Sequence, residues 1–310
     1  MKFHSMISLL VLVFMVVILV SVSDAVESEL AETDFRAEVS SRPLRNRVGV
    51  TFFKNSTAFQ DNRLVTITDK TITDTLRESC PEVVSVTDEN QAFSALRNKQ
   101  PRRVSGVIDS LTLAMQGRKL GLNAIVTGEI AEIKGAQEEL GYLWFKGMVF
   151  YVHVHVLVSV YDTETGAKLI EKYFSDEGEI SEDAYYKINA KEFTPALPVI
   201  EKLLVSLSSQ LADEVCEVIE EEPFKTYVKS ADGERITVTA GRNAGISEGN
   251  LFNIHDSSRI ISSKDDHQFI ISGPKTGMLR IDTVTEDSAV GVIVEGENKG
   301  MNSCLILFEE

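Results

Sequence analysis

The pentapeptide Gly245-Ile-Ser-Glu-Gly249 has the G-x-S-x-G pattern in which serine hydrolases hold their nucleophile. That chemistry requires a buried strand before the serine and a helix after it, so that the hydroxyl stands above a sheet. Here a glycine-rich stretch precedes the serine, and Leu251–Ile254 after it has the pattern of another strand. We therefore predict that Gly245 and Gly249 serve a loop between strands. A hydrolase that uses Ser247 is the alternative.

Two histidines, His153 and His155, alternate along a predicted strand and so share one face, as metal ligands can. No third cysteine, histidine or paired carboxylate has a spacing that points to them, which favours a plain polar strand face. The loop Lys264–His267 lacks the oxygen-rich spacing of a calcium loop. Pro274 removes an amide that a phosphate-binding loop would need. We therefore predict no catalytic residue, metal or cofactor, and no enzymatic activity.

The three cysteines, Cys80, Cys216 and Cys304, lack the spacing of a metal site. In an oxidising compartment one pair can form a disulfide, and Cys80 with Cys216 is the favoured pair. Three buried thiols are the alternative that the sequence leaves open.

The chain carries 47 acidic and 31 basic residues, a net charge of −16. Such a surface repels phosphate backbones, which argues against nucleic acid as a partner. It also argues against charge-driven binding to an anionic membrane, so any membrane association is expected to be indirect.

Residues 1–25 have the basic start, apolar middle and small-residue end of a secretory signal, with cleavage expected after Ala25. An uncleaved anchor is the alternative. No cysteine follows the apolar stretch, so a lipid anchor on an N-terminal cysteine is excluded. Residues 26–45 are polar and acidic and are expected to form a linker. The chain is therefore predicted to be exported to the periplasm.

The elements predicted for residues 46–222 form an α/β domain around a mixed sheet. We expect strands at 47–53, 81–86 and 122–130, and helices at 64–79 and 106–121. Residues 145–174 alternate over two faces, and the turn 162–166, with Gly166, makes them a hairpin. Its apolar face, from Met148 to Val160, should lie on the core. The opposite face carries Tyr151, His153, His155 and Tyr161.

A long helix with an apolar stripe from Ile200 to Val218 closes this domain, and the run Glu220–Glu222 before Pro223 ends it. Residues 223–310 then alternate short apolar segments with turns, including turn glycines Gly241, Gly245 and Gly249. That pattern predicts a small all-β barrel or sandwich. The fold class is therefore α+β.

Three segments resemble a bacterial envelope domain, the α/β domain of the TolB amino-terminal region, of the curli secretion protein CsgG and of the middle part of flagellar assembly protein T. They are Arg47-Val-Gly-Val-Thr-Phe-Phe-Lys-Asn-Ser56, Leu120-Gly-Leu-Asn-Ala-Ile-Val-Thr-Gly-Glu-Ile130 and Val158-Ser-Val-Tyr-Asp-Thr-Glu-Thr-Gly166. The tail resembles the C-terminal domain of flagellar assembly protein T, through Ile236-Thr-Val-Thr-Ala-Gly-Arg-Asn-Ala-Gly-Ile-Ser-Glu-Gly-Asn-Leu-Phe252 and Thr276-Gly-Met-Leu-Arg-Ile-Asp-Thr-Val284.

The resemblance implies a non-catalytic periplasmic scaffold that helps to assemble an envelope machine, such as the flagellar basal-body ring, by contact with other envelope proteins. The chain departs from these families in two ways. Residues 26–45 are too few for the further N-terminal domain of flagellar assembly protein T, which argues against a motor-ring role. CsgG-type pores are lipoproteins, whereas this chain lacks the required cysteine after its apolar stretch. A periplasmic ligand- or peptidoglycan-binding module, or a regulator of a secretion or cell-wall system, is the alternative function. The expected contact surface is the face of Tyr151, His153, His155 and Tyr161 or the barrel loops, and a homo-oligomer is compatible with it.

Overall fold

The computed structural model describes residues 43–51, 53–86, 91–97, 101–104, 107–263, 267–296 and 304–308. They belong to one compact unit that begins at Pro43. The predicted leader, 1–25, and most of the predicted linker, 26–45, lie outside the described residues.

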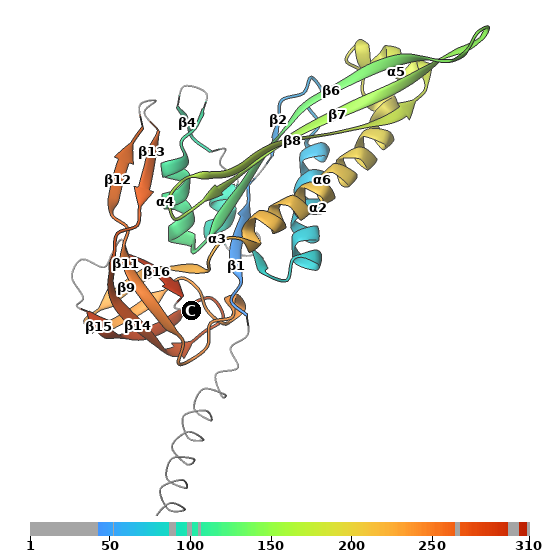
Figure 1. Cartoon of the computed structure of the whole chain (residues 1–310). Helices are drawn as coiled ribbons and strands as arrows, with labels where there is room; N and C mark the ends of the chain where they lie inside the picture. The colour runs from blue at the N-terminus through green and yellow to red at the C-terminus, as the bar shows by residue number, and fades with distance from the viewer. Residues whose placement is uncertain are drawn as a thin grey trace, which may run out of the picture. The chain divides into compact units, whose positions relative to one another are not determined.

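A mixed sheet forms the first half of this unit, with strand order β3-β1-β6-β7-β8 and β2 beside β6 (Figure 1). Its first strands, β1 (Asn46–Val50), β2 (Lys54–Asn55) and β3 (Val83–Val86), are short, and β1 runs parallel to both β3 and β6. The next three are long and antiparallel: β6 (Ala124–Tyr142), β7 (Phe145–Asp162) and β8 (Lys168–Ile180).

Helices α2 (Asn62–Ser79), α5 (Glu182–Asn189) and α6 (Leu197–Glu220) pack on one face of the sheet, with a short 3-10 helix, η1 (Thr194–Ala196), before α6. The valines at alternate positions of β7 from Val152 to Val160 are buried against them, as the alternation predicts. The apolar stripe of α6 completes this core, because Ile200, Leu204 and Leu211 are fully buried.

Among the described residues, the opposite face of the sheet is covered only at the end nearest the barrel, by α3 (Gln91–Arg97) and α4 (Ser110–Leu120). A small two-stranded ribbon, β4 (Arg103–Val104) and β5 (Val107–Ile108), precedes α4. The predicted helix start at 106 is therefore wrong, because the side chain of Asp109 caps the helix by accepting a bond from the Thr112 amide. Gly121 ends α4 in the left-handed conformation, at a φ of 68°.

The second half of the unit is a closed barrel with strand order β10-β15-β14-β11-β16-β9. Its strands are β9 (Lys225–Asp232), β10 (Arg235–Val238), β11 (Leu251–Asp256), β14 (Lys275–Val284), β15 (Ala289–Gly296) and β16 (Cys304–Phe308). A 3-10 helix, η2 (Arg242–Ala244), follows β10, and β12 (Arg259–Ser262) pairs with β13 (Gln268–Ile271) as a separate ribbon. The barrel interior is apolar, with Ile236, Phe252 and Leu279 fully buried. The predicted α+β class and small barrel are confirmed.

A disulfide joins Cys80, at the end of α2, to Cys216 in α6, with their Cα atoms 5.8 Å apart. The favoured cysteine pair is therefore the bonded one, and it ties two helices of the main core together. The side chain of Cys304 lies outside the described residues.

Candidate interaction surface

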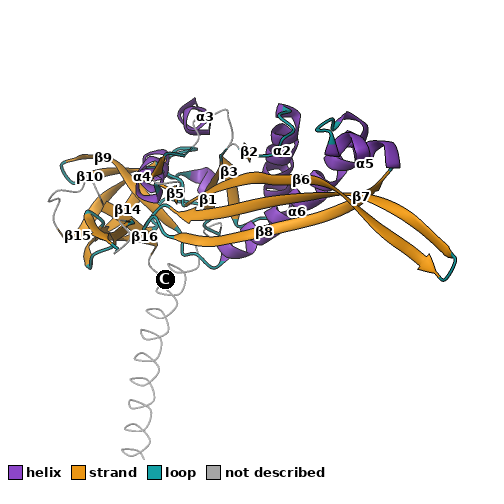
Figure 2. Cartoon of the chain, turned by 90° about the horizontal axis from the view of Figure 1, so that it is seen from above, coloured by secondary structure: helices purple, strands orange, loops and turns teal. Residues whose placement is uncertain are grey.

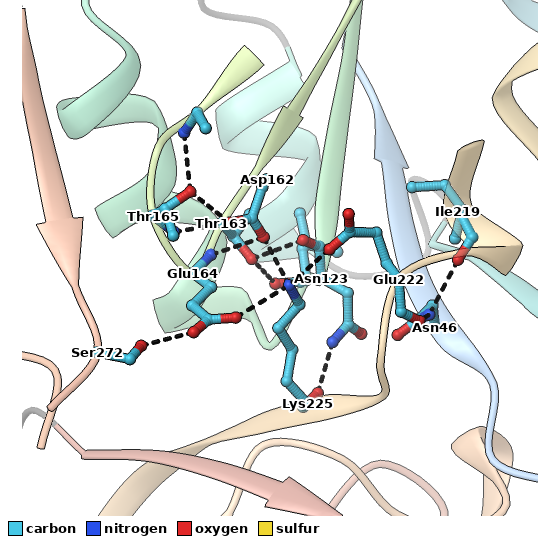
Figure 3. A network of polar contacts seen from close by, with 12 residues as sticks. Asn46, Asn123, Asp162, Thr163, Glu164, Thr165, Ile219, Glu222, Lys225 and Ser272 are labelled. Carbon is cyan, nitrogen blue, oxygen red and sulfur yellow. Dashed lines mark hydrogen bonds and ion pairs between the residues drawn. The ribbon is translucent and has the colours of Figure 1, made fainter. Parts of the chain in front are cut away.

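A buried cluster of charges lies where the sheet meets the barrel, around Lys225 (Figure 3). The Nζ of Lys225 donates to Asp162 Oδ1 at 2.7 Å, to Glu164 Oε2 at 3.2 Å and to Glu222 Oε2 at 3.3 Å. Asp162 also accepts bonds from the backbone amides of Glu164, at 3.0 Å, and Thr165, at 2.7 Å. The cluster therefore fixes the β7–β8 turn against the first residue of the barrel.

The charges of this cluster stabilise one another. Burial by itself lowers the pKa of Lys225, but Asp162 and Glu164 outweigh it and hold that pKa above its usual value. Burial likewise raises the pKa of Asp162, yet Lys225 and the hydrogen bonds to this carboxylate bring the net pKa below its usual range. Perturbed pKa values accompany catalytic sites, but ion-pair networks produce them too. Because Lys225 and Asp162 are both buried and bonded to each other, we assign the cluster a structural role.

Three further side chains join the sheet to the barrel. The amide of Asn123 donates to the Lys225 carbonyl at 2.5 Å, and its oxygen accepts from the Arg47 amide at 2.7 Å. The Arg47 guanidinium donates to the Thr239 carbonyl. Arg118 of α4 donates to the Thr163 carbonyl at 2.8 Å and to Ser257 Oγ at 3.0 Å. These bonds cross from one half to the other at several points, so the two halves hold a fixed arrangement.

The predicted contact face lies on the outer side of β7, and three of its four residues reach solvent. Tyr151, His153 and His155 are partly exposed. Each histidine faces a carboxylate: His153 Nδ1 is 3.3 Å from Glu177 Oε2, and His155 Nε2 is 3.8 Å from Glu132 Oε2. Among the described residues, the one group with metal-like geometry is instead Cys80, Cys216 and Glu220, whose cysteines are disulfide-bonded.

Tyr161 does not belong to an exposed face, which corrects the sequence prediction. It is 4% exposed and packs with Phe93, Leu113 and Ile125 in the small core under α3 and α4. Strand alternation places Tyr161 on the same side of the sheet as Tyr151. The alternation does not show which part of this side is covered by helices. Helices α3 and α4 cover the barrel end, where Tyr161 lies, and they come from segments distant in the sequence.

The far end of the β6–β7 hairpin was missed by the sequence analysis. The two strands pair until Tyr142 faces Phe145, and a two-residue turn, Leu143–Trp144, connects them. Tyr142 is 80% exposed, Leu143 56% and Trp144 83%. Figure 2 shows this end extending beyond α5. The signal available in the sequence was the chain's one tryptophan, set between apolar neighbours just before the predicted hairpin.

This hairpin end is continuous with the contact face. The register pairs Tyr142 with Phe145, Leu140 with Gly147 and Ala136 with Tyr151, and directly paired residues lie on the same side of a sheet. Leu140 and Tyr142 therefore lie on the side of Tyr151 and His153. We call Tyr151, His153 and His155 the outer ribbon face, and Tyr142, Leu143 and Trp144 the hairpin tip.

A cavity of about 250 Å³ lies beside β6 and β7 near their barrel end. The charged residues in its wall are paired: Lys54 and Arg103 with Glu129, at 3.2 and 3.8 Å, and Lys168 with Glu171 at 2.5 Å. The cavity is smaller than the roughly 300–1,000 Å³ typical of ligand pockets. Each of these charged side chains has its partner within the wall, so the cavity gives no ligand class that it would select.

The four predicted turn glycines have two different structural reasons. Gly166, Gly245 and Gly249 have positive φ, of 77°, 86° and 89°. Gly241 has a negative φ, but a Cβ there would lie 2.4 Å from the Thr285 carbonyl oxygen. Ser247 lies between η2 and β11, and its amide donates to Asn250 Oδ1 at 2.7 Å. A strand therefore follows the serine where a hydrolase needs a helix, so the nucleophile-elbow alternative is wrong.

No protein-family model matches the chain, and no curated protein matches it. Among solved structures it is similar to a hypothetical protein from Chlamydia trachomatis, at 15% identity over 56% of this chain and 99% of that one, with a TM-score of 0.32. A lipoprotein from Neisseria meningitidis has 10% identity over 49% of this chain and 99% of that one, with a TM-score of 0.30. A PelC dodecamer from Paraburkholderia phytofirmans has 12% identity over 56% and 92%, with a TM-score of 0.29.

TM-scores of 0.32, 0.30 and 0.29 are too low to establish a common fold. The resemblance to flagellar assembly protein T and to the TolB and CsgG domains therefore stays a prediction from the sequence. No helix among the described residues is long and apolar enough to cross a bilayer.

Proposed function

We propose that this protein is a non-catalytic periplasmic scaffold that helps to assemble an envelope machine by contact with another envelope protein. The observation that supports the proposal is the outer ribbon face. Tyr151, His153 and His155 stand on a long, regular strand whose other side is sealed by the main core. Tyrosine is enriched at protein interfaces because it offers contact area at a low cost in conformational entropy.

The rigid framework behind this face supports the same function. The disulfide fixes α2 to α6, and the Lys225 cluster fixes the β7–β8 turn to the barrel. A face held on a rigid support loses little conformational freedom when it binds, so more of the contact energy appears as affinity. The finer proposal, a role in flagellar basal-body ring assembly, rests on the sequence resemblance to flagellar assembly protein T.

Photo-crosslinking from the outer ribbon face in intact cells tests the proposal. A benzophenone amino acid replaces Tyr151 in one strain and Tyr186 in another. Tyr186 is a matched control because it is 60% exposed and lies on α5, against the opposite face of the sheet. We expect one discrete crosslinked envelope protein from position 151 and none from position 186. Equal crosslinking patterns from the two positions would contradict the proposal.

A swimming assay tests the flagellar version separately. A deletion strain is complemented with the wild type or with a Tyr151→Ala, His153→Ala double variant. The flagellar version predicts that the deletion strain is non-motile and that the double variant restores swimming less than the wild type. Normal swimming of the deletion strain, with a crosslinked partner from a secretion apparatus, would exclude the flagellar role. The general proposal of a periplasmic scaffold would still hold.

A further inference from the structure

The hairpin tip and the ribbon just behind it expose apolar side chains. Leu140 and Tyr142 lie on the outer side, and Met148, 48% exposed, lies on the other side, opposite Glu139. Leu143 and Trp144 form the turn between them. A surface that docks on a folded protein is usually apolar on one side. Lys146, opposite Gly141, is the one charged residue nearer to the turn than the Glu139–Met148 pair, so the end of this ribbon suits an apolar environment that surrounds it.

The turn itself is built against ordinary folding preferences. Leu143 has a φ of 54°, in the left-handed region where a two-residue hairpin turn normally places glycine, asparagine or aspartate. A branched apolar side chain in this conformation is uncommon and strained. Its side chain is also 56% exposed, so the strain gains no packing within the chain. Strain of this kind concentrates at positions kept for function.

Charged residues begin only behind the tip, and those nearest to it form an ion pair. Lys146 Nζ lies 3.0 Å from Glu139 Oε2, so the first charged pair has no net charge. Lys146 stands two residues after Trp144, which is about 7 Å at the rise of a strand. That spacing matches the roughly 5–10 Å to which interfacial segments enter a bilayer, and the lysine stem can extend toward the headgroups.

We propose that the hairpin tip inserts into the interfacial layer of a lipid bilayer with zwitterionic headgroups. Tyrosine and tryptophan prefer this layer because each has an apolar ring and a polar atom. Leu143 enters the acyl boundary between them. The charge of −16 makes an anionic bilayer a poorer partner than a neutral one. The contact is direct, whereas the sequence predicted only an indirect one, and it is separate from the protein contact of the outer ribbon face.

Trp144 makes the test specific, because it is the one tryptophan of the chain. The protein is titrated with phosphatidylcholine vesicles while the tryptophan emission is recorded, with and without lipids brominated along the acyl chain. We expect a blue shift that saturates with lipid, and quenching by lipids brominated near the headgroup end. The emission reports on the tip even when another part of the chain contacts the vesicle.

A pair of variants separates insertion from general adsorption. Leu143→Asn keeps Trp144 and relieves the left-handed strain. We expect this variant to bind vesicles about tenfold more weakly, because it lacks the leucine side chain that the bilayer would bury. Val205→Asn, at an exposed apolar position of α6, should bind like the wild type. Replacing part of the phosphatidylcholine by phosphatidylglycerol should weaken binding at low salt.

Three results would overturn the proposal: an emission unchanged by excess vesicles, equal vesicle affinities of Leu143→Asn and the wild type, or tighter binding to phosphatidylglycerol vesicles. Each of these three results measures binding to lipid and none of them measures binding to a protein partner. Crosslinking from Tyr151 can succeed while vesicle binding fails, or the reverse, so the two proposals are tested independently.

Discussion

Lys225 shows how a single buried charge decides the arrangement of two halves of a chain. Its side chain is 1% exposed and has three carboxylates within 3.3 Å, from the β7–β8 turn and from the end of α6. A buried ion pair of this kind adds little stability over an apolar replacement of the whole group. Removing one partner is costly, because it leaves the others charged and desolvated. The cluster therefore specifies a geometry more than it adds stability.

The first prediction concerns the loss of this lysine. Lys225→Met should lower the free energy of unfolding by about 3–5 kcal/mol, because Asp162 is left as a buried, unpaired carboxylate. Urea unfolding followed by circular dichroism measures it. The control is Arg242→Met, which removes an exposed pair with Glu286 and should cost less than about 1 kcal/mol. Similar losses in the two variants would show that the cluster has no special role.

The pH dependence of the same residue gives the second prediction. The pKa of Asp162 is lower in the folded protein than its unfolded value of about 3.9. Its contribution to stability is therefore present above that pH and is lost as the pH falls through the folded-state pKa. The difference in unfolding free energy between the wild type and Lys225→Met should shrink as the pH is lowered from about 6 to about 3. A constant difference over this range would contradict the assigned pairing.

At the scale of elements, the β6–β7 hairpin is one continuous ribbon with three environments. Its barrel end is covered on both sides, by the main core and by α3 and α4. Its middle is covered on one side and carries the outer ribbon face. Its tip lies beyond α5 and has no covering element among the described residues (Figure 2). The same alternating sequence pattern therefore gives a buried tyrosine at 161, a half-exposed one at 151 and an exposed one at 142.

The third prediction concerns the bond between α2 and α6. The Cys80–Cys216 disulfide spans 136 residues of chain, so it restricts the unfolded chain strongly. Reduction with dithiothreitol should lower the free energy of unfolding by about 2–5 kcal/mol. Urea unfolding with and without the reductant measures this. Cys304→Ser should keep the full effect and Cys216→Ser should abolish it. An equal response of the two variants would contradict the pairing.

At the scale of the whole described unit, the sheet and the barrel share their polar contacts. Arg47, Asn123 and Lys225 bond across the boundary, and Arg118 reaches from α4 to Ser257. These bonds are buried or half-buried, so they are stronger than surface contacts. We therefore expect neither the sheet half nor the barrel half to be stable on its own, because each would lose these shared bonds.

The fourth prediction follows from these shared contacts. The wild type should unfold in one cooperative transition in which sheet and barrel signals coincide. Hydrogen exchange of the amides of β1 and β6 reports on the sheet, and that of the amides of β11 and β14 reports on the barrel. Asn123→Ala, which breaks the link between Arg47 and Lys225, should separate the two midpoints. Two transitions in the wild type would show that the halves are independent.

The sequence by itself determined the local elements and their pattern of burial. The valine alternation in β7, the stripe of α6, the glycine that ends α4 and the turn glycines 166, 245 and 249 all follow from periodicity and backbone sterics. The disulfide could be named as the favoured pair but not decided. The α+β class and the small barrel followed from the order of these elements.

Only the tertiary structure decided where the elements cover one another. Tyr161 is buried because α3 and α4 fold back over it, and the hairpin tip is exposed because α5 ends before it. Lys225 is buried because segments 63 residues apart meet around it. Periodicity reports which side of a strand a residue faces. What lies on that side depends on contacts between distant segments, which no local pattern contains.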